Sequence, residues 1–181
     1  MTRSLQLLIP MIAILVMAVA NPGRGRAKGS PMRALVGTFV YAGSSERGRI
    51  MIDRVIEQAT EDMGFLRECV ASDRLEEKTA IARRIVIARE KNMVTVEFQG
   101  ATYRSRINGG WVTATSPGGE SISVRHRIRG DKLVQDIRTK KGRRVNLFSA
   151  RGKDHLNLDV VISSPHLPED VHYDLRYRRV E

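Results

Sequence analysis

Residues 45–75 read SERGRIMIDRVIEQATEDMGFLRECVASDRL, and apolar side chains recur in this stretch at steps of three and four residues. That spacing places them on one face of an α-helix. Ser44 or Ser45 can cap its first turn. Gly64 interrupts the pattern, so we expect either one bent helix or two helices, over about 46–63 and 65–75. The apolar face consists of Ile52, Val55, Ile56, Ala59, Met63, Leu66 and Val70.

From residue 83 onward the apolar residues recur at every second position instead. This alternation predicts half-buried β-strands, and one further strand, 35–41, precedes the helical stretch. Short turn sequences separate the strands, and Asn108-Gly109-Gly110 is typical of a hairpin. About ten strands are predicted, the later ones at about 84–88, 94–98, 102–107, 111–115, 121–128, 133–138, 145–149, 156–162 and 171–178.

The helical stretch has to bury its apolar face, and the sheet is the only partner that the sequence offers. Hairpin-linked strands form an up-and-down meander, and closure removes its long exposed edges. We therefore predict an α+β fold that is mainly antiparallel β. The expected barrel of about ten strands is closed or nearly closed. The helical segment lies between its first and second strands.

The N-terminal residues 1–20 have the pattern of a secretory signal peptide. Arg3 provides the positive start, an apolar run extends from Leu5 to Val16, and Ala18-Val19-Ala20 is a small-x-small cleavage site. A retained membrane anchor is the alternative, although the run is short for one. We expect cleavage near Ala20 and export, to the periplasm or as a secreted protein. Residues 21–34 are predicted to be a disordered basic linker, and 35–181 to be the barrel domain.

Charge and cysteine content limit which partners and which cysteine chemistry are expected. The net charge is +11, with 31 basic and 20 acidic residues, and five of the basic residues precede Leu35. This excess favours anionic partners, such as a membrane surface or an envelope polymer, and export makes nucleic acid the least expected of them. Cys69 is the only cysteine, so no internal disulfide can form. We expect it to be a small buried hydrophobe rather than a reactive thiol.

The order of elements resembles the fatty-acid-binding-protein branch of the calycins, the group that also holds the lipocalins. Gly37 and Phe39 in the first strand, and Gly130-Asp131-Lys132-Leu133-Val134-Gln135, add to the resemblance. It implies a closed barrel, an internal cavity for an apolar ligand, and helices that act as a lid. That family commonly holds a carboxylate with an Arg-x-Tyr pair on its last strand. Here alternation directs Arg176 and Arg178 outward, so the resemblance does not imply that mode of binding.

Motifs for catalysis are absent from the sequence. It contains no phosphate loop, nucleophile elbow, Cys-x-x-Cys or His-Glu-x-x-His, and its four histidines are scattered. We therefore predict no enzyme, no cofactor and no metal site. His126 falls on an apolar strand face, where it is either a core histidine paired to a carbonyl or tyrosine, or a polar anchor in a pocket. The predicted ligand-binding residues are His126, Gln135, Tyr103, Tyr173 and Tyr177; Ser105 and Ser149 are also expected to face inward.

Arginines gather on the faces predicted to point outward. They form either a solvated surface, paired with Asp136, Asp159 and Asp174, or a basic patch that docks on anionic lipid or polymer. Two functions are preferred over a third, an enzyme of unfamiliar type for which the sequence offers only His126 as a titratable group. One is an exported, non-enzymatic protein that holds an apolar or lipid-like ligand. The other is a structural or interaction module of the cell envelope with a filled barrel and a basic docking face. The outward set is Arg104, Arg106, Arg125, Arg127, Arg138, Arg144, Arg176 and Arg178.

Overall fold

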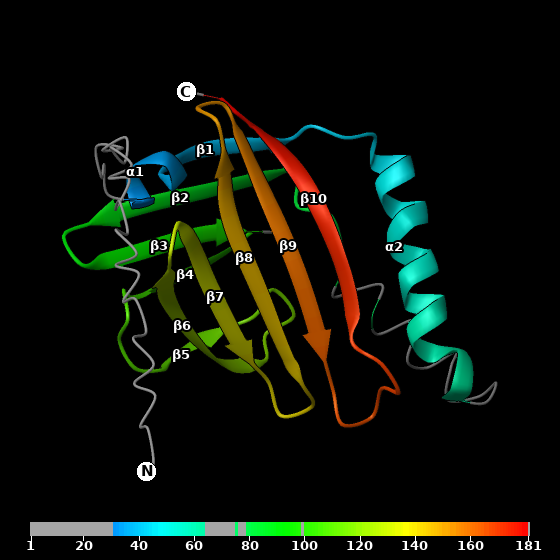
Figure 1. Cartoon of the computed structure of the whole chain (residues 1–181). Helices are drawn as coiled ribbons and strands as arrows, with labels where there is room; N and C mark the ends of the chain where they lie inside the picture. The colour runs from blue at the N-terminus through cyan, green and yellow to red at the C-terminus, as the bar shows by residue number, and fades with distance from the viewer. Residues whose placement is uncertain (1–30, 64–74, 76–78, 99, 181) are drawn as a thin grey trace, which may run out of the picture.

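A computed structural model describes residues 31–63, 75, 79–98 and 100–180 (Figure 1). Among these residues, helices α1 and α2 accompany strands β1 to β10, which curve into one sheet. In chain order the elements are α1 (Pro31–Leu35), β1 (Gly37–Tyr41), α2 (Ser45–Thr60), the 3-10 turn η1 (Glu61–Met63), β2 (Arg84–Glu90), β3 (Met93–Phe98), β4 (Ala101–Arg106), β5 (Val112–Thr115), β6 (Ser121–Arg129), β7 (Lys132–Arg138), β8 (Arg143–Arg151), β9 (His155–Ser163) and β10 (Val171–Arg179).

The sheet is a nearly closed antiparallel barrel, which confirms the predicted fold class. Its strand order is β4-β3-β2-β1-β10-β9-β8-β7-β6-β5. The first and last strands pair, with Phe39 opposite Arg179. The two edge strands are therefore β4 and β5, which are consecutive in the chain.

The hairpin predicted at Asn108-Gly109-Gly110 is wrong, because β4 and β5 are the unpaired edges of the sheet. The chain instead crosses toward β6: the backbone N–H of Asn108 donates to the carbonyl of His126 at 2.9 Å. Asn108 has a left-handed backbone, with φ of 57°, which lets the chain turn there. Its side-chain oxygen accepts from the N–H of Ile128 at 3.0 Å. Hydrogen bonds from this turn to β6 thus span the gap between the two edges of the sheet, where the described strands form no ladder.

Helix α2 begins where the sequence predicts. Ser44 caps it by accepting a hydrogen bond from the N–H of Arg47 at 3.4 Å. Ile52, Ile56 and Ala59 are buried, and the helix packs against β10 (Figure 1). The second part of the predicted helical stretch, with Leu66, Cys69 and Val70, lies outside the described residues. No helix in the described ranges is both long and apolar enough to span a membrane.

Helix α1 begins inside the predicted linker. Met32 and Leu35 are buried against the barrel core, so residues 31–34 belong to the folded domain. Arg179 at the end of β10 fastens this segment, because its guanidinium donates to the carbonyls of Ala34 and Val36 at 2.6 Å each. The signal segment and residues 21–30 lie outside the described part of the chain.

Alternation assigns most strands to their faces correctly, but not β8. Asn146 and Phe148 are fully buried, whereas Ser149, which was expected inside, lies on the outer face and is half-buried. Apolar residues occur on both faces of β8. Hydrophobicity alone therefore predicts, wrongly, that Val145 and Leu147 face the interior. Asn146 can face inward because its buried amide is hydrogen-bonded to Gln135 on β7 and to Arg144 on β8.

Candidate functional site

A chain of hydrogen-bonded polar side chains crosses the barrel interior. Ser105 on β4 lies 2.7 Å from Nδ1 of His126 on β6, and His126 Nε2 lies 3.0 Å from the Gln135 amide on β7. Gln135 in turn accepts from Asn146 on β8 at 2.8 Å. Arg144 completes the chain by donating from Nε to the Asn146 oxygen at 2.8 Å. Four strands are thus tied together by side chains.

The direction of this network is fixed by Arg144, because a guanidinium can only donate hydrogen bonds. Asn146 must accept with its oxygen and donate with its amide to Gln135. Gln135 must then donate to Nε2 of His126. The imidazole proton therefore lies on Nδ1 and is donated to Ser105, which also accepts the backbone N–H of His126 at 3.1 Å.

His126 is a buried, neutral histidine in this arrangement. Burial lowers the pKa of its imidazole to about 4. Protonation would place a second N–H against the Gln135 amide, which already donates there. Its side-chain partners are Ser105 and Gln135 rather than the carbonyl or tyrosine considered from sequence. Because Ser105 lies on an edge strand, the pair also closes the seam between β4 and β6.

Arg144 is half-buried on the inner face of β8, so its predicted outward position is wrong. It lies two residues before the buried Asn146 on the same strand face, and its guanidinium stacks 4.8 Å from the ring centre of Phe98. The reversed register of β8 explains the error, since the sequence Arg143-Arg144 provides one arginine for each face. A positive charge therefore lies at the interior end of the polar chain.

The charge of Arg144 acts on three tyrosines. Burial raises the pKa of Tyr103, Tyr173 and Tyr177, and the charge of Arg144 opposes the rise at each hydroxyl. The hydroxyls of Tyr173 and Tyr177 are buried and have no hydrogen-bond partner among the described residues. A buried hydroxyl left unpaired costs about 1–3 kcal/mol. The two hydroxyls can donate hydrogen bonds to an oxygen atom of a bound ligand, in the field of the positively charged Arg144.

All five predicted site residues are buried: His126, Gln135, Tyr103, Tyr173 and Tyr177. Of these, His126 and Gln135 are hydrogen-bonded to each other. Sequence reasoning missed Arg144 and Asn146. Both could have been found by assigning the other set of alternate residues of β8, Arg144-x-Asn146-x-Phe148, to the interior. That assignment extends the polar chain from Gln135 onto β8. On β10, Arg176 and Arg178 are exposed, as predicted.

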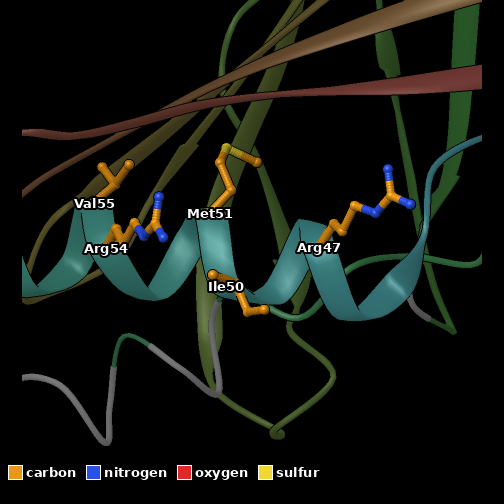
Figure 2. A pocket seen from close by; sticks show the side chains of 5 residues that line it. All are labelled: Arg47, Ile50, Met51, Arg54 and Val55. Carbon is orange, nitrogen blue, oxygen red and sulfur yellow. The ribbon is translucent and has the colours of Figure 1, made fainter.

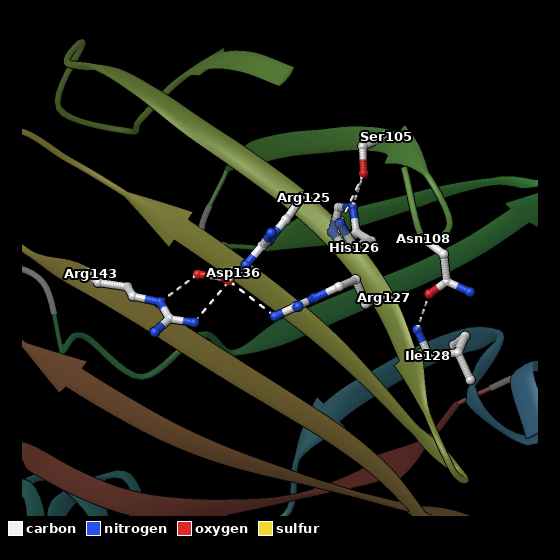
Figure 3. A network of polar contacts seen from close by, with 8 residues as sticks. All are labelled: Ser105, Asn108, Arg125, His126, Arg127, Ile128, Asp136 and Arg143. Atoms are coloured by element: carbon white, nitrogen blue, oxygen red, sulfur yellow. Dashed lines mark hydrogen bonds and ion pairs between the residues drawn. The ribbon is translucent and has the colours of Figure 1, made fainter. Parts of the chain in front are cut away.

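The outer face carries a separate ion cluster around Asp136 (Figure 3). Its carboxylate is fully buried and accepts from Arg125 at 2.8 Å, Arg143 at 2.7 Å and Arg127 at 3.3 Å. Burial alone would raise the pKa of Asp136, but the hydrogen bonds and charges of Arg143 and Arg125 hold it below its usual value. The predicted pairing of outward arginines with Asp136 is confirmed, and three arginines share this one carboxylate.

Trp111 extends this outer surface. The guanidinium carbons of Arg125 and Arg138 lie 4.1 and 4.2 Å from its ring centre. Such contacts hold a cation over an aromatic face. Trp111 therefore positions two arginines on the outside of the sheet.

Two pockets lie outside the barrel interior. One, of about 380 Å³, follows α2 and is lined by Arg47, Ile50, Met51, Arg54 and Val55 (Figure 2). Met51 and Val55 point to one side of the helix and Ile50 to the other, where it is 47% exposed. The second, of about 450 Å³, lies between the β7–β8 turn and the segment Ser163–Pro165.

Solved structures resemble this barrel, although no protein-family model matches the sequence and no curated protein does either. A secretary abundant heat soluble protein from Ramazzottius varieornatus superposes with a TM-score of 0.54 at 11% identity, covering 81% of this chain and 96% of that one. The fluorescent protein UnaG gives 0.53 at 14%, with 83% and 99% covered. Echinococcus granulosus fatty-acid-binding protein 1 gives 0.51 at 11%, with 83% and 100% covered. The chain therefore has the fold of the calycin-like barrels.

Proposed function

We propose that the protein is an exported, non-enzymatic binding protein that holds a lipid-like ligand inside its barrel. The observation that carries the proposal is that the buried hydroxyls of Tyr173 and Tyr177 have no hydrogen-bond partner within the described ranges and lie in the field of Arg144. A site of this kind is completed by an acceptor oxygen, and the apolar strands around it suit a hydrocarbon chain. The preferred ligand is thus an amphiphile with an acidic head.

The fold adds support from a different direction. Structures with the same architecture carry the names Echinococcus granulosus fatty-acid-binding protein 1 and REP1-NXSQ fatty acid transporter. For export, the support is the N-terminal pattern of a basic start, an apolar run and Ala18-Val19-Ala20. For the absence of catalysis, it is the lack of any known catalytic motif in the sequence. His126, the one plausible general base, is neutral and occupied at both ring nitrogens.

The proposal can be tested by native mass spectrometry. The purified protein is stripped of lipid, mixed with a cell lipid extract and desalted, and retained species are identified by mass. We expect wild type to retain acidic lipids. Arg144→Gln and Tyr173→Phe should retain less, because each removes a group that meets the head of the ligand. Arg176→Gln is the matched control, since Arg176 is exposed on the outer face of β10.

Wild-type protein that stays empty throughout would refute ligand carriage. Equal loss in Arg176→Gln and Arg144→Gln would mean that general surface charge, rather than the interior, retains the lipid. Undiminished lipid retention by Tyr173→Phe would show that the Tyr173 hydroxyl takes no part in binding the ligand. Thermal unfolding of each variant confirms that it is folded.

A second candidate function is an interaction module with a filled barrel. It is favoured by the complete burial of Ile52 from α2. In this case the outer arginines dock the protein on an anionic membrane or polymer of the envelope. Binding to anionic vesicles that weakens with added salt, in a protein that retains no lipid, would favour this function over carriage.

A further inference from the structure

The pocket of about 450 Å³ at one end of the barrel is formed by two turns. Residues 138–143 of the β7–β8 hairpin provide one wall. Ser163 at the end of β9, with Ser164 and Pro165 after it, provides the other. The connections of an up-and-down meander alternate between its two ends. The β1–β2, β7–β8 and β9–β10 connections therefore lie at the same end of the barrel. Helix α2 is part of the β1–β2 connection and begins at this end. The pocket is separate from the barrel interior and from the proposed lipid site.

The walls of this pocket are held in place by hydrogen bonds. Thr139 Oγ1 accepts the backbone N–H groups of Lys141 and Gly142, each at 3.1 Å, which fixes the turn. The Ser164 hydroxyl donates to the carbonyl of Lys141 at 2.7 Å and so joins the two walls. A Cβ on Gly142 would lie 2.5 Å from the carbonyl oxygen of Ser163, so the close approach of the walls requires glycine. The pocket is thus preorganised.

The lining is strongly positive. Four of the nine described lining residues are cations, Arg138, Lys140, Lys141 and Arg143, and none of the nine is acidic. The carboxylate beside it, Asp136, already accepts from three guanidiniums. Neither lysine has an ion-pair partner within the described ranges. Like charges gathered in this way repel one another, and a bound anion relieves that repulsion.

The positions of the two arginines are also fixed. Arg143 holds Asp136 with both Nε, at 2.7 Å, and a terminal nitrogen, at 2.9 Å. Arg138 stacks on Trp111. The two arginines are directly opposite each other in the β7–β8 register, while Lys140 and Lys141 are exposed on the turn between them. Fixed guanidiniums and adaptable ammonium groups together suit a tetrahedral oxyanion with several acceptor oxygens.

We propose that this pocket is a binding site for a phosphate group, either free or as the phosphomonoester head of a lipid. The phosphate accepts hydrogen bonds from Lys140 and Lys141 and lies in the field of Arg138 and Arg143. The inference does not depend on lipid carriage inside the barrel, because no residue of the pocket lines that interior.

Inorganic phosphate is the first probe. It is titrated into isotope-labelled full-length protein at constant ionic strength, with chloride as the reference anion, and backbone amide shifts are followed by NMR. We expect saturable shifts at Thr139–Gly142 and at Ser163 and Ser164. In Lys140→Gln/Lys141→Gln the affinity should fall about tenfold or more, since two charge-assisted hydrogen bonds are lost.

Two matched variants control for charge. Arg151→Gln/Lys153→Gln removes the same charge from the β8–β9 turn at the opposite end of the barrel, and should change phosphate affinity less than about twofold. Lys140→Arg/Lys141→Arg keeps the charge and should retain binding. Shifts spread evenly over the basic surfaces, or equal weakening in both glutamine variants, would overturn the proposal. So would shifts no larger than those caused by chloride.

A second arm identifies the source of the phosphate. Vesicles of phosphatidic acid in phosphatidylcholine are compared with phosphatidylcholine alone. Binding of the phosphatidic acid vesicles that inorganic phosphate competes away, and that Lys140→Gln/Lys141→Gln abolishes, would assign a lipid headgroup. Saturable inorganic phosphate binding without vesicle binding would assign a free phosphate. Failure of both arms would overturn the site while leaving the interior lipid test unaffected.

Discussion

His126 should make the stability of the barrel depend on pH between about 4 and 6.5. Its imidazole is fully buried and accepts a hydrogen bond from Gln135 only while Nε2 is unprotonated. Burial lowers the pKa of the imidazole to about 4 from the usual value of 6.5. In the unfolded chain the same group protonates as the pH falls through 6.5. The unfolded state therefore binds one more proton than the folded state in this interval.

The sign and size follow from proton linkage. Stability is complete above pH 6.5 and falls as the pH decreases toward 4, because protons then favour the unfolded chain. A pKa difference of this size corresponds to a total loss of about 3 kcal/mol, at about 1 kcal/mol per pH unit in the middle of the range. The lowered pKa of Asp136 adds a further loss, which begins at lower pH, near the usual carboxyl value of 3.8.

Urea unfolding at half-unit steps from pH 4.5 to 7.5 measures this dependence. Each protein is compared with its own stability at pH 7.5. His126→Gln does not titrate and should lack most of the slope. His172→Gln removes an exposed histidine from β10 and should keep the slope. Equal slopes in wild type and His126→Gln, or an NMR titration that places the His126 pKa near 6.5, would refute the reasoning.

Three further substitutions test the packing, each by urea unfolding at neutral pH. Asp136→Asn should lower the free energy of unfolding by about 2 kcal/mol, because three partly exposed arginines lose their shared carboxylate. Added salt should restore part of the lost stability by screening the repulsion between these arginines. Ile52→Ala should cost about 2–4 kcal/mol, whereas Ile50→Ala on the exposed side of α2 should cost less than about 0.5 kcal/mol; equal costs would contradict the placement of the helix. Gly142→Ala should cost about 1–3 kcal/mol, since its Cβ would meet the Ser163 carbonyl oxygen at 2.5 Å, and a neutral result would contradict that approach.

The architecture was predictable because local patterns determine it. The change from helical spacing to alternation marks the boundary between helix and sheet, and Ser44 caps α2 as expected. The buried positions of His126 and Gln135 also follow from alternation. The pairing of β1, the first strand, with β10, the last, follows from the need to cover strand edges.

The errors arise where long-range contacts decide. The sequence Asn108-Gly109-Gly110 is a good turn locally, but β5 pairs with β6 and leaves β4 as an edge. In β8, both faces contain apolar residues, and contacts with other strands, such as the hydrogen bond from Asn146 to Gln135, decide which face points inward. Arg144 moves inside as a consequence. Such choices depend on partners on other strands, which no local window of sequence contains.

The interior location of the ligand is tested most directly by NMR contacts between a bound fatty acid and methyl groups of the protein. We expect intermolecular contacts from the hydrocarbon chain to Leu158, Val160 and Leu175, which are buried inside the barrel. The outward methyl groups of Val145 and Leu147 should show none. Contacts confined to the outward methyl groups, or no contacts with fatty acid in excess, would contradict a ligand inside the barrel.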